Sequence, residues 1–145
     1  MNLFALEPFP LPTEDLILKK LEGLAAAFNH HDVDAVLSFF AENCSMELPQ
    51  GPEPCGRRFE GKVAVRSGVA SRFTGLPDVH YSNVSHRVIG QLGISRWTVS
   101  GTTSGGERIV ANGCDFYSFD AEARVTKKDS YWKIVQNQTL EMNPE

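Results

Sequence analysis

The last third of the chain reads as three consecutive antiparallel strands that mix large aromatic side chains with isolated charged ones. These strands are predicted at 94–104, 107–120 and 124–135. A sheet that serves stability alone carries Val and Ile on its buried face, whereas these strands carry Asp, Lys, Tyr and Trp. Side chains of this mixture line pockets for small molecules. The sequence therefore predicts a sheet whose inner face forms the wall of a cavity.

Helical patterns precede these strands. Apolar side chains recur at helical intervals after Thr13, which is placed to cap a helix that ends near 29–31. Asp32 is placed to cap a short second helix whose inward-facing apolar residues extend to Phe40. A third helix is predicted at 61–72. We therefore expect three helices in the first half of the chain.

The remaining elements follow from β-branched and turn residues: strands at 44–48 and 79–89, and loops at 50–56 and 57–60. Helices followed by a meander predict an α+β domain, in which a cone-shaped, curved antiparallel sheet packs against three N-terminal helices and encloses a pocket. The domain is expected at 13–137, between an extended proline-containing arm at 1–12 and a tail at 138–145.

Size and charge exclude several classes of function. The chain has 145 residues, enough for one domain with a core, and a formal net charge of -4. That charge argues against nucleic acid or an anionic membrane as a partner. No apolar run approaches the roughly 20 residues that span a bilayer, and the N-terminus does not read as a signal peptide. We expect a protein whose partners are small molecules or a second copy of itself.

The three cysteines, Cys44, Cys55 and Cys114, have no metal-binding spacing. They predict free thiols in a reducing cytoplasm, with a Cys44–Cys55 disulfide as the alternative. Two histidines, His80 and His86, lie six residues apart on one predicted strand and are expected to share a face. No Cys or further His completes a zinc set with them, so no metal and no cofactor are expected.

The segment 25–43, AAAFNHHDVDAVLSFFAEN, resembles the nuclear transport factor 2-like superfamily. The runs WTVSGT at 97–102 and GCDF at 113–116, with the Gly105-Gly106 turn, look like its SnoaL-type polyketide cyclase and ketosteroid isomerase-like branches. The resemblance covers about 13–135 and implies a cone-shaped fold that usually dimerises. Because this fold hosts isomerases, cyclases, dehydratases and non-catalytic binders, the resemblance implies no single reaction.

Transfer of the ketosteroid isomerase residues mostly fails. The resemblance places their proton-shuttling Asp at Leu48, before Pro49, and their oxyanion-hole Tyr at Leu24. Only their second oxyanion donor, an Asp in the penultimate strand, has a counterpart, Asp115. Steroid isomerisation by that mechanism is therefore not expected.

Hairpin geometry groups candidate site residues around Asp115. A turn at 120–123 places Phe119 opposite Arg124, and stepping back pairs Asp115 with Lys128, with Tyr117 on the same face. A buried carboxylate either finds a cation or becomes protonated. Asp115 is thus a candidate general acid, base or hydrogen-bond donor in the pocket. The alternatives are a structural Asp115–Lys128 pair or a place at a dimer contact.

Aromatic and imidazole side chains complete the candidate site. Trp97 belongs to an apolar set and points inward, either against a ligand or into the core. Whether it shares a face with Asp115 stays open, because one residue more or less in the 105–106 loop would place the two side chains on opposite faces. Trp132 falls on the face of Asp115. His86 lies mid-strand and is a candidate general base or acid, with a surface position as the alternative. We expect Trp97, Tyr117, Lys128 and Trp132 to bind substrate, and Asp115 and His86 to be catalytic.

Three hypotheses of function follow. The first is a cofactor-independent acid–base enzyme of isomerase, cyclase or dehydratase type, acting on an apolar, cyclic carbonyl substrate. The second is a non-catalytic small-molecule binder of the same fold. The third is a structural dimerisation module with a plugged pocket. Apolar side chains on the outer sheet face, Phe116, Tyr131 and Ile89, predict a homodimer.

Overall fold

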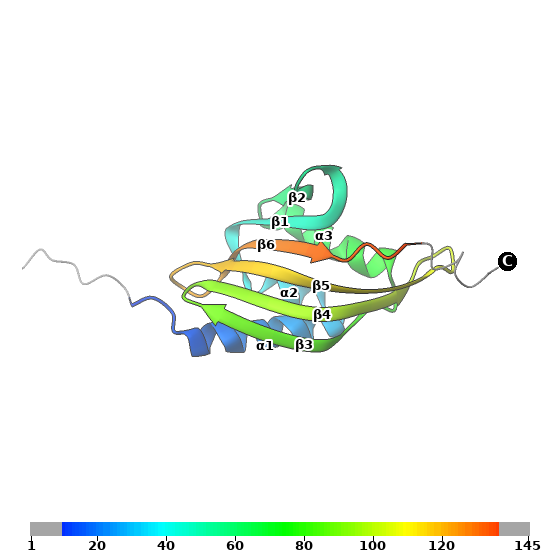
Figure 1. The fold of residues 1–145 in the computed structure, drawn as a ribbon. Coiled ribbons are helices and arrows are strands. Elements are labelled where there is room, and N and C mark those ends of the chain that lie inside the picture. The colour runs from blue at the N-terminus through cyan, green and yellow to red at the C-terminus, as the bar shows by residue number, and fades with distance from the viewer. Residues whose placement is uncertain (1–9, 137–145) are drawn as a thin grey trace, which may run out of the picture.

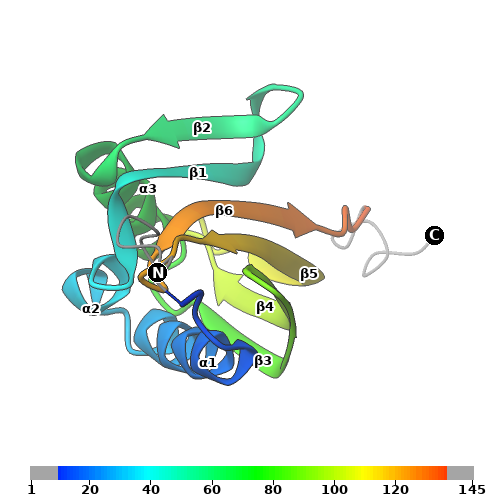
Figure 2. The same cartoon turned by 90° about the vertical axis from the view of Figure 1, so that its left-hand side faces the viewer.

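The fold consists of a curved sheet that wraps around three helices. The structure, a computed structural model, describes residues 10–136. Its elements follow in the order α1 (Glu14–Asn29), α2 (Val33–Leu37), β1 (Phe40–Glu53), β2 (Gly56–Glu60), α3 (Lys62–Gly75), β3 (His80–Ile89), β4 (Leu92–Thr102), β5 (Arg108–Phe119) and β6 (Val125–Trp132). Figure 2 shows the three helices on one side of the sheet. The predicted α+β class is confirmed.

The sheet is mixed rather than wholly antiparallel. Its strand order is β2-β1-β6-β5-β4-β3, as Figure 1 shows from top to bottom. Each neighbouring pair is antiparallel except β1 and β6, which run parallel. A parallel pair needs a long crossover, and here the whole chain between β1 and β6 supplies it. Hairpin signals in the sequence report only consecutive strands and so could not show this pairing.

The arm predicted for 1–12 lies mostly outside the described residues, as does the tail at 138–145. Among residues 10–136, no helix is long and apolar enough to cross a membrane.

The first hairpin corrects two predicted loops. β1 continues to Glu53 and β2 covers Gly56–Glu60, so most of 50–56 and all of 57–60 are strand. Leu48 pairs with Arg57 and Glu53 with Gly56, with a register shift between. A strand tolerates proline at such an irregularity because ladder hydrogen bonds are already missing there. The Gly and Pro content thus marks an irregular hairpin.

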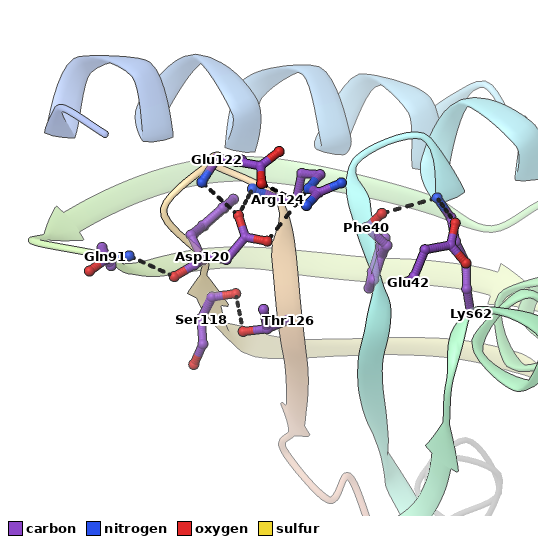
Figure 3. Close-up of polar contacts among 10 residues, drawn as sticks. Phe40, Glu42, Lys62, Gln91, Ser118, Asp120, Glu122, Arg124 and Thr126 are labelled. Carbon is purple, nitrogen blue, oxygen red and sulfur yellow. Dashed lines mark hydrogen bonds and ion pairs between the residues drawn. The ribbon is translucent and has the colours of Figure 1, made fainter. Parts of the chain in front are cut away.

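The predicted helix starts are confirmed. Thr13 Oγ1 accepts a hydrogen bond from the N–H of Leu16, and Asp32 Oδ1 accepts one from Ala35. α1 buries the predicted apolar face on the sheet. Phe40, predicted at the end of the second helix, instead begins β1, and it is fully buried there. Its carbonyl oxygen accepts a hydrogen bond of 3.0 Å from Lys62 Nζ at the start of α3 (Figure 3).

The β5–β6 turn sets the register of the strands that carry the candidate site. The Asp120 carboxylate accepts hydrogen bonds of 2.9 Å from the N–H groups of Glu122 and Arg124 (Figure 3). Phe119 pairs with Val125 rather than with Arg124 as predicted, and a bulge follows. Beyond the bulge the pairs are displaced by two residues from the prediction. A displacement of two keeps every side chain on its predicted face.

A second irregularity, in β3, overturns the prediction that His80 and His86 share a face. His80 pairs with Ser100 and His86 with Ser95, and the register shifts between Ser82 and Ser85. Asn83 in this interval has a positive φ of 52°. One extra residue reverses the alternation, so the two imidazoles point to opposite faces of the sheet.

Candidate ligand-binding pocket

The concave side of the sheet and α1 enclose a pocket. It holds about 350 Å3 of empty space, part of which is open to solvent. The apolar part of its wall comes from Leu21, Ala25 and Phe28 on α1 and from Tyr81 and Val84 on β3. These α1 residues repeat at intervals of three and four, which places them on one helical face. The pocket thus lies where the apolar face of α1 meets the sheet.

The polar part of the wall comes from β4, β5 and β6. Ser95, Trp97, Asp115, Tyr117 and Lys128 line it. Ser95 is the direct strand partner of Asp115, and Tyr117 is that of Lys128. Directly opposed residues share a face, so these pairings bring the polar groups together. Four of the six predicted site residues therefore line this pocket: Trp97, Asp115, Tyr117 and Lys128.

Asp115 is at the centre of a buried network of donors. Lys128 Nζ lies 3.1 Å from Oδ1, and Ser130 Oγ also donates to Oδ1. Trp97 Nε1 donates to Oδ2 at 2.9 Å, and the Tyr117 hydroxyl lies 3.5 Å from the same oxygen. Asp115 is only 5% exposed. All four neighbours are donors, which is the environment of a carboxylate that accepts hydrogen bonds.

The prediction that Asp115 and Lys128 are direct strand partners is wrong, because the strand partner of Asp115 is Ser130. Lys128 reaches the carboxylate all the same from its position opposite Tyr117. Its Nζ also donates to Ser130 Oγ at 2.7 Å and lies 5.3 Å from the centroid of the Phe28 ring. The ion pair and the pocket wall are thus one feature, and the structural and functional explanations of Asp115 do not exclude each other.

The two tyrosines of the pocket are protonated donors. Burial raises the pKa of Tyr117 well above its ordinary value, and the nearby Asp115 carboxylate raises it further. Burial raises the pKa of Tyr81 to about 12, although the charge of Arg72 acts in the opposite direction. Desolvation disfavours the phenolate in both cases. Each hydroxyl can therefore donate a hydrogen bond to an oxygen of a ligand.

His86 does not line the first pocket but contacts Ser95, which does. Its Nδ1 is 2.8 Å from Ser95 Oγ, and Ser95 lines the pocket. Burial lowers the pKa of His86, and the charge of Glu22 partly offsets this. The imidazole is therefore neutral near pH 7 and contacts the pocket through one hydroxyl. His80 is exposed on the other face of the sheet.

A second pocket adjoins the first and shares Phe28, Tyr81, Trp97 and Lys128 with it; its empty space of about 310 Å3 also includes open solvent. Trp132, the remaining predicted binding residue, lies in this second pocket. Its ring is 6.2 Å from that of Trp97, nearly perpendicular to it.

Arg72 also lines the second pocket, and sequence reasoning missed it. Its Cζ lies 4.6 Å from the centroid of the Trp132 ring. The spacing of Val65, Val69 and Arg72 along α3 is a signal that could have found it, because these positions share one helical face. Sequence reasoning also did not assign Ser95 to the site.

Other sequence predictions concern thiols and metals. Cys44, Cys55 and Cys114 are free, so the alternative of a Cys44–Cys55 disulfide is not realised. Within residues 10–136, no three His, Cys, Asp or Glu side chains come together as metal ligands do.

A model of the SnoaL-like domain matches residues 21–127. No curated protein matches the sequence. Among solved structures, a candidate polyketide cyclase from Xanthomonas campestris pv. campestris is 22% identical, with a TM-score of 0.71, covering 83% of this chain and 92% of its own.

Two further structures are similar at the level of the fold. SalBIII, an epoxide hydrolase/cyclase-like enzyme of pyran ring formation in salinomycin, is 21% identical with a TM-score of 0.69, covering 83% of this chain and 93% of its own. A candidate isomerase from Bacillus subtilis is 16% identical with a TM-score of 0.71, covering 84% and 90%. With the family match over most of its length, the chain belongs to the SnoaL-like domain family, within the nuclear transport factor 2-like superfamily that its helical segment resembles.

Proposed function

We propose that this protein is a cofactor-independent enzyme that moves a proton next to the carbonyl group of a small, apolar, cyclic substrate, in a reaction of isomerase, cyclase or dehydratase type. The observation that carries the proposal is the position of the Asp115 carboxylate in the pocket wall beside two donors, Tyr117 and Lys128. Enzymes of this kind combine a proton acceptor with donors that stabilise the developing oxyanion.

The roles follow from the geometry. Asp115 Oδ2, whose contact with Tyr117 is the longest in the network, is the proton acceptor. The Tyr117 hydroxyl and Lys128 Nζ donate to the substrate oxygen as it becomes an enolate. His86, held neutral by burial, is a second acceptor that acts through Ser95 Oγ. Phe28 and Trp97 supply the apolar surface for a ring.

The test is hydrogen exchange at the carbon next to the carbonyl. Cyclic ketones and 1,3-diketones are incubated with the protein in D2O, and deuterium incorporation is followed by NMR. We expect Asp115→Asn to slow exchange by about 100-fold or more, and His86→Gln to slow it less. Arg96→Gln, on the exposed outer face of β4, is the matched control. Equal rates of deuterium incorporation with the wild type, Asp115→Asn and His86→Gln would contradict the proposal.

The Asp115 carboxylate has four hydrogen-bond donors around it, and this also favours a second candidate function, that of a non-catalytic binder. A carboxylate held this firmly can serve to orient Tyr117 and Lys128 toward a ligand without taking a proton itself. This candidate predicts that a ligand binds to the wild type and to His86→Gln alike, and that no deuterium enters it.

We further propose that the protein forms a homodimer through the outer face of the sheet. Phe116 and Tyr131 are 37% and 55% exposed there, and their rings lie 5.7 Å apart, edge to face. Ile89, 68% exposed at the end of β3, extends the apolar surface. Exposed apolar surface of this kind is typical of contacts between protein chains.

A further inference from the structure

We propose that the ligand carries an anionic group of the carboxylate class, which binds Arg72 in the second pocket while the ring and carbonyl occupy the first. This inference rests on the proposed function, since it names the class of molecule that the pocket takes. It concerns a different residue and a different compartment from the proton transfer.

The charges that line the second pocket are all positive. Arg72 and Lys128 line it, and no Asp or Glu does so. Lys128 is paired with Asp115, which belongs to the wall of the first pocket. Among residues 10–136, the ion pairs include none for Arg57, Arg72, Arg87 or Arg96, and of these four only Arg72 is half-buried rather than exposed. In a chain of net charge -4, the second pocket thus holds an arginine without a carboxylate partner in the described part of the molecule.

The guanidinium of Arg72 is directed toward the pocket. It is half-buried, it lies over the Trp132 ring, and its charge lowers the pKa of Tyr81 on β3. A location in the last turn of α3 would also suit the helix dipole. The dipole alone, however, does not require the side chain to fold over an indole inside a cavity.

Arginine is suited to a carboxylate because its planar fork donates two parallel hydrogen bonds. The guanidinium lies over the Trp132 ring and hydrogen-bonds the Tyr81 side chain, and its five N–H donors leave others that can bind a carboxylate. A lysine would offer a point charge without this directionality. The position of Arg72 over Trp132 therefore favours a planar anion such as a carboxylate over a neutral polar group.

The shared wall connects the two compartments. Phe28, Tyr81, Trp97 and Lys128 border both pockets, so a ligand that contacts Asp115 in one can extend to Arg72 in the other. A ring bearing both a carbonyl and a carboxylate fits this division of apolar, donor and cationic surface. The inferred substrate class is thus a small cyclic keto acid or a related enolic acid.

The test compares benzoate with benzamide, which have nearly the same shape but differ in charge. The chain has two tryptophans, and both line the second pocket, so the two indole N–H signals in a 1H–15N spectrum report binding there. We expect benzoate to bind about tenfold more tightly than benzamide, which corresponds to about 1.4 kcal/mol. Arg72→Gln should abolish this preference, and Arg72→Lys should retain part of it.

Arg66→Gln is the matched control, because Arg66 lies on the same helix but pairs with Asp34 at the surface. It should leave the preference for benzoate unchanged. Equal binding of the two probes by the wild type, or an unchanged preference in a folded Arg72→Gln variant, would overturn the anion inference alone. Failure of both probes to bind the wild type would instead overturn the pocket function on which it rests.

Discussion

The indole Nε1 of Trp97 donates a hydrogen bond of 2.9 Å to Asp115 Oδ2 across the β4–β5 pair. The two residues are diagonal neighbours, because Trp97 is opposite Gly113 and Ser95 is opposite Asp115. The Trp97 ring lies over Gly113, where a Cβ atom would come within 2.6 Å of two ring carbons. The glycine thus leaves the space that lets the indole reach the carboxylate, and the three residues form one structural unit.

Gly113→Ala should therefore destabilise the protein. The added methyl group would meet both the Trp97 ring and the Tyr131 carbonyl oxygen, at 2.4 Å, and neither can move without disturbing the sheet. We expect a loss of about 1–3 kcal/mol in the free energy of unfolding, measured with urea. Gly105→Ala is the control, since its Cβ would meet nothing closer than 3.8 Å. A loss of the same size in both variants would contradict this explanation.

A second prediction concerns the Asp115–Lys128 pair, whose side chains are 7% and 9% exposed. Asp115→Asn leaves the Lys128 ammonium buried without its counter-ion, and removal of one partner of such a pair costs about 3–5 kcal/mol. Asp115→Asn/Lys128→Met removes both charges, and it should recover most of that loss. Urea unfolding of the wild type, both single variants and the double variant gives the coupling energy.

Additive losses in that cycle would show that the two side chains do not interact, contrary to the 3.1 Å contact between them. The pair Lys127–Glu47 offers a comparison, because Lys127 is 41% exposed at its side chain. Lys127→Met should cost much less than Asp115→Asn, since the Glu47 carboxylate keeps its second cation, Arg58, at 3.1 Å.

The sequence predicted the face of each site residue on β4, β5 and β6 better than its strand partner. The predicted pairing of Asp115 with Lys128 was displaced by two residues. Because side chains alternate between faces with a period of two, both residues still lie on the predicted face. In β3 the prediction that His80 and His86 share a face failed, because one extra residue in the irregularity around Asn83 reverses the alternation. A bulge depends on local backbone geometry that side-chain patterns do not reveal.

Contacts between segments distant in the sequence were the other feature that the sequence did not predict. The parallel pairing of β1 with β6 and the approach of Arg72 to Trp132 join residues that no hairpin or helical repeat connects. Periodicity shows which face of an element is buried, but not which neighbour covers it. The helical face of Arg72 was therefore readable from the sequence, whereas its pocket was not.

A third prediction tests the proposed dimer. Phe116→Glu places a charge on the outer face, where burial against a second copy would be costly. If this face pairs, the wild type should elute as a dimer in size-exclusion chromatography with light scattering, and the variant as a monomer. Val63→Glu, on the exposed side of α3 at 88% exposure, is the control and should remain dimeric. A monomeric wild type at high concentration would contradict the proposal.

The last prediction concerns His86 and acid stability. Burial lowers the pKa of His86 in the folded state below its ordinary value of 6.5, so over that interval the unfolded chain binds a proton that the folded chain does not. Stability should therefore fall as the pH drops from about 7 through the folded-state pKa, with a slope of at most about 1.4 kcal/mol per pH unit from this group. His86→Gln should flatten the dependence of the unfolding free energy on pH in this window. An identical slope in wild type and His86→Gln would show that the imidazole titrates as it does in water, and that its contact with Ser95 does not hold it neutral.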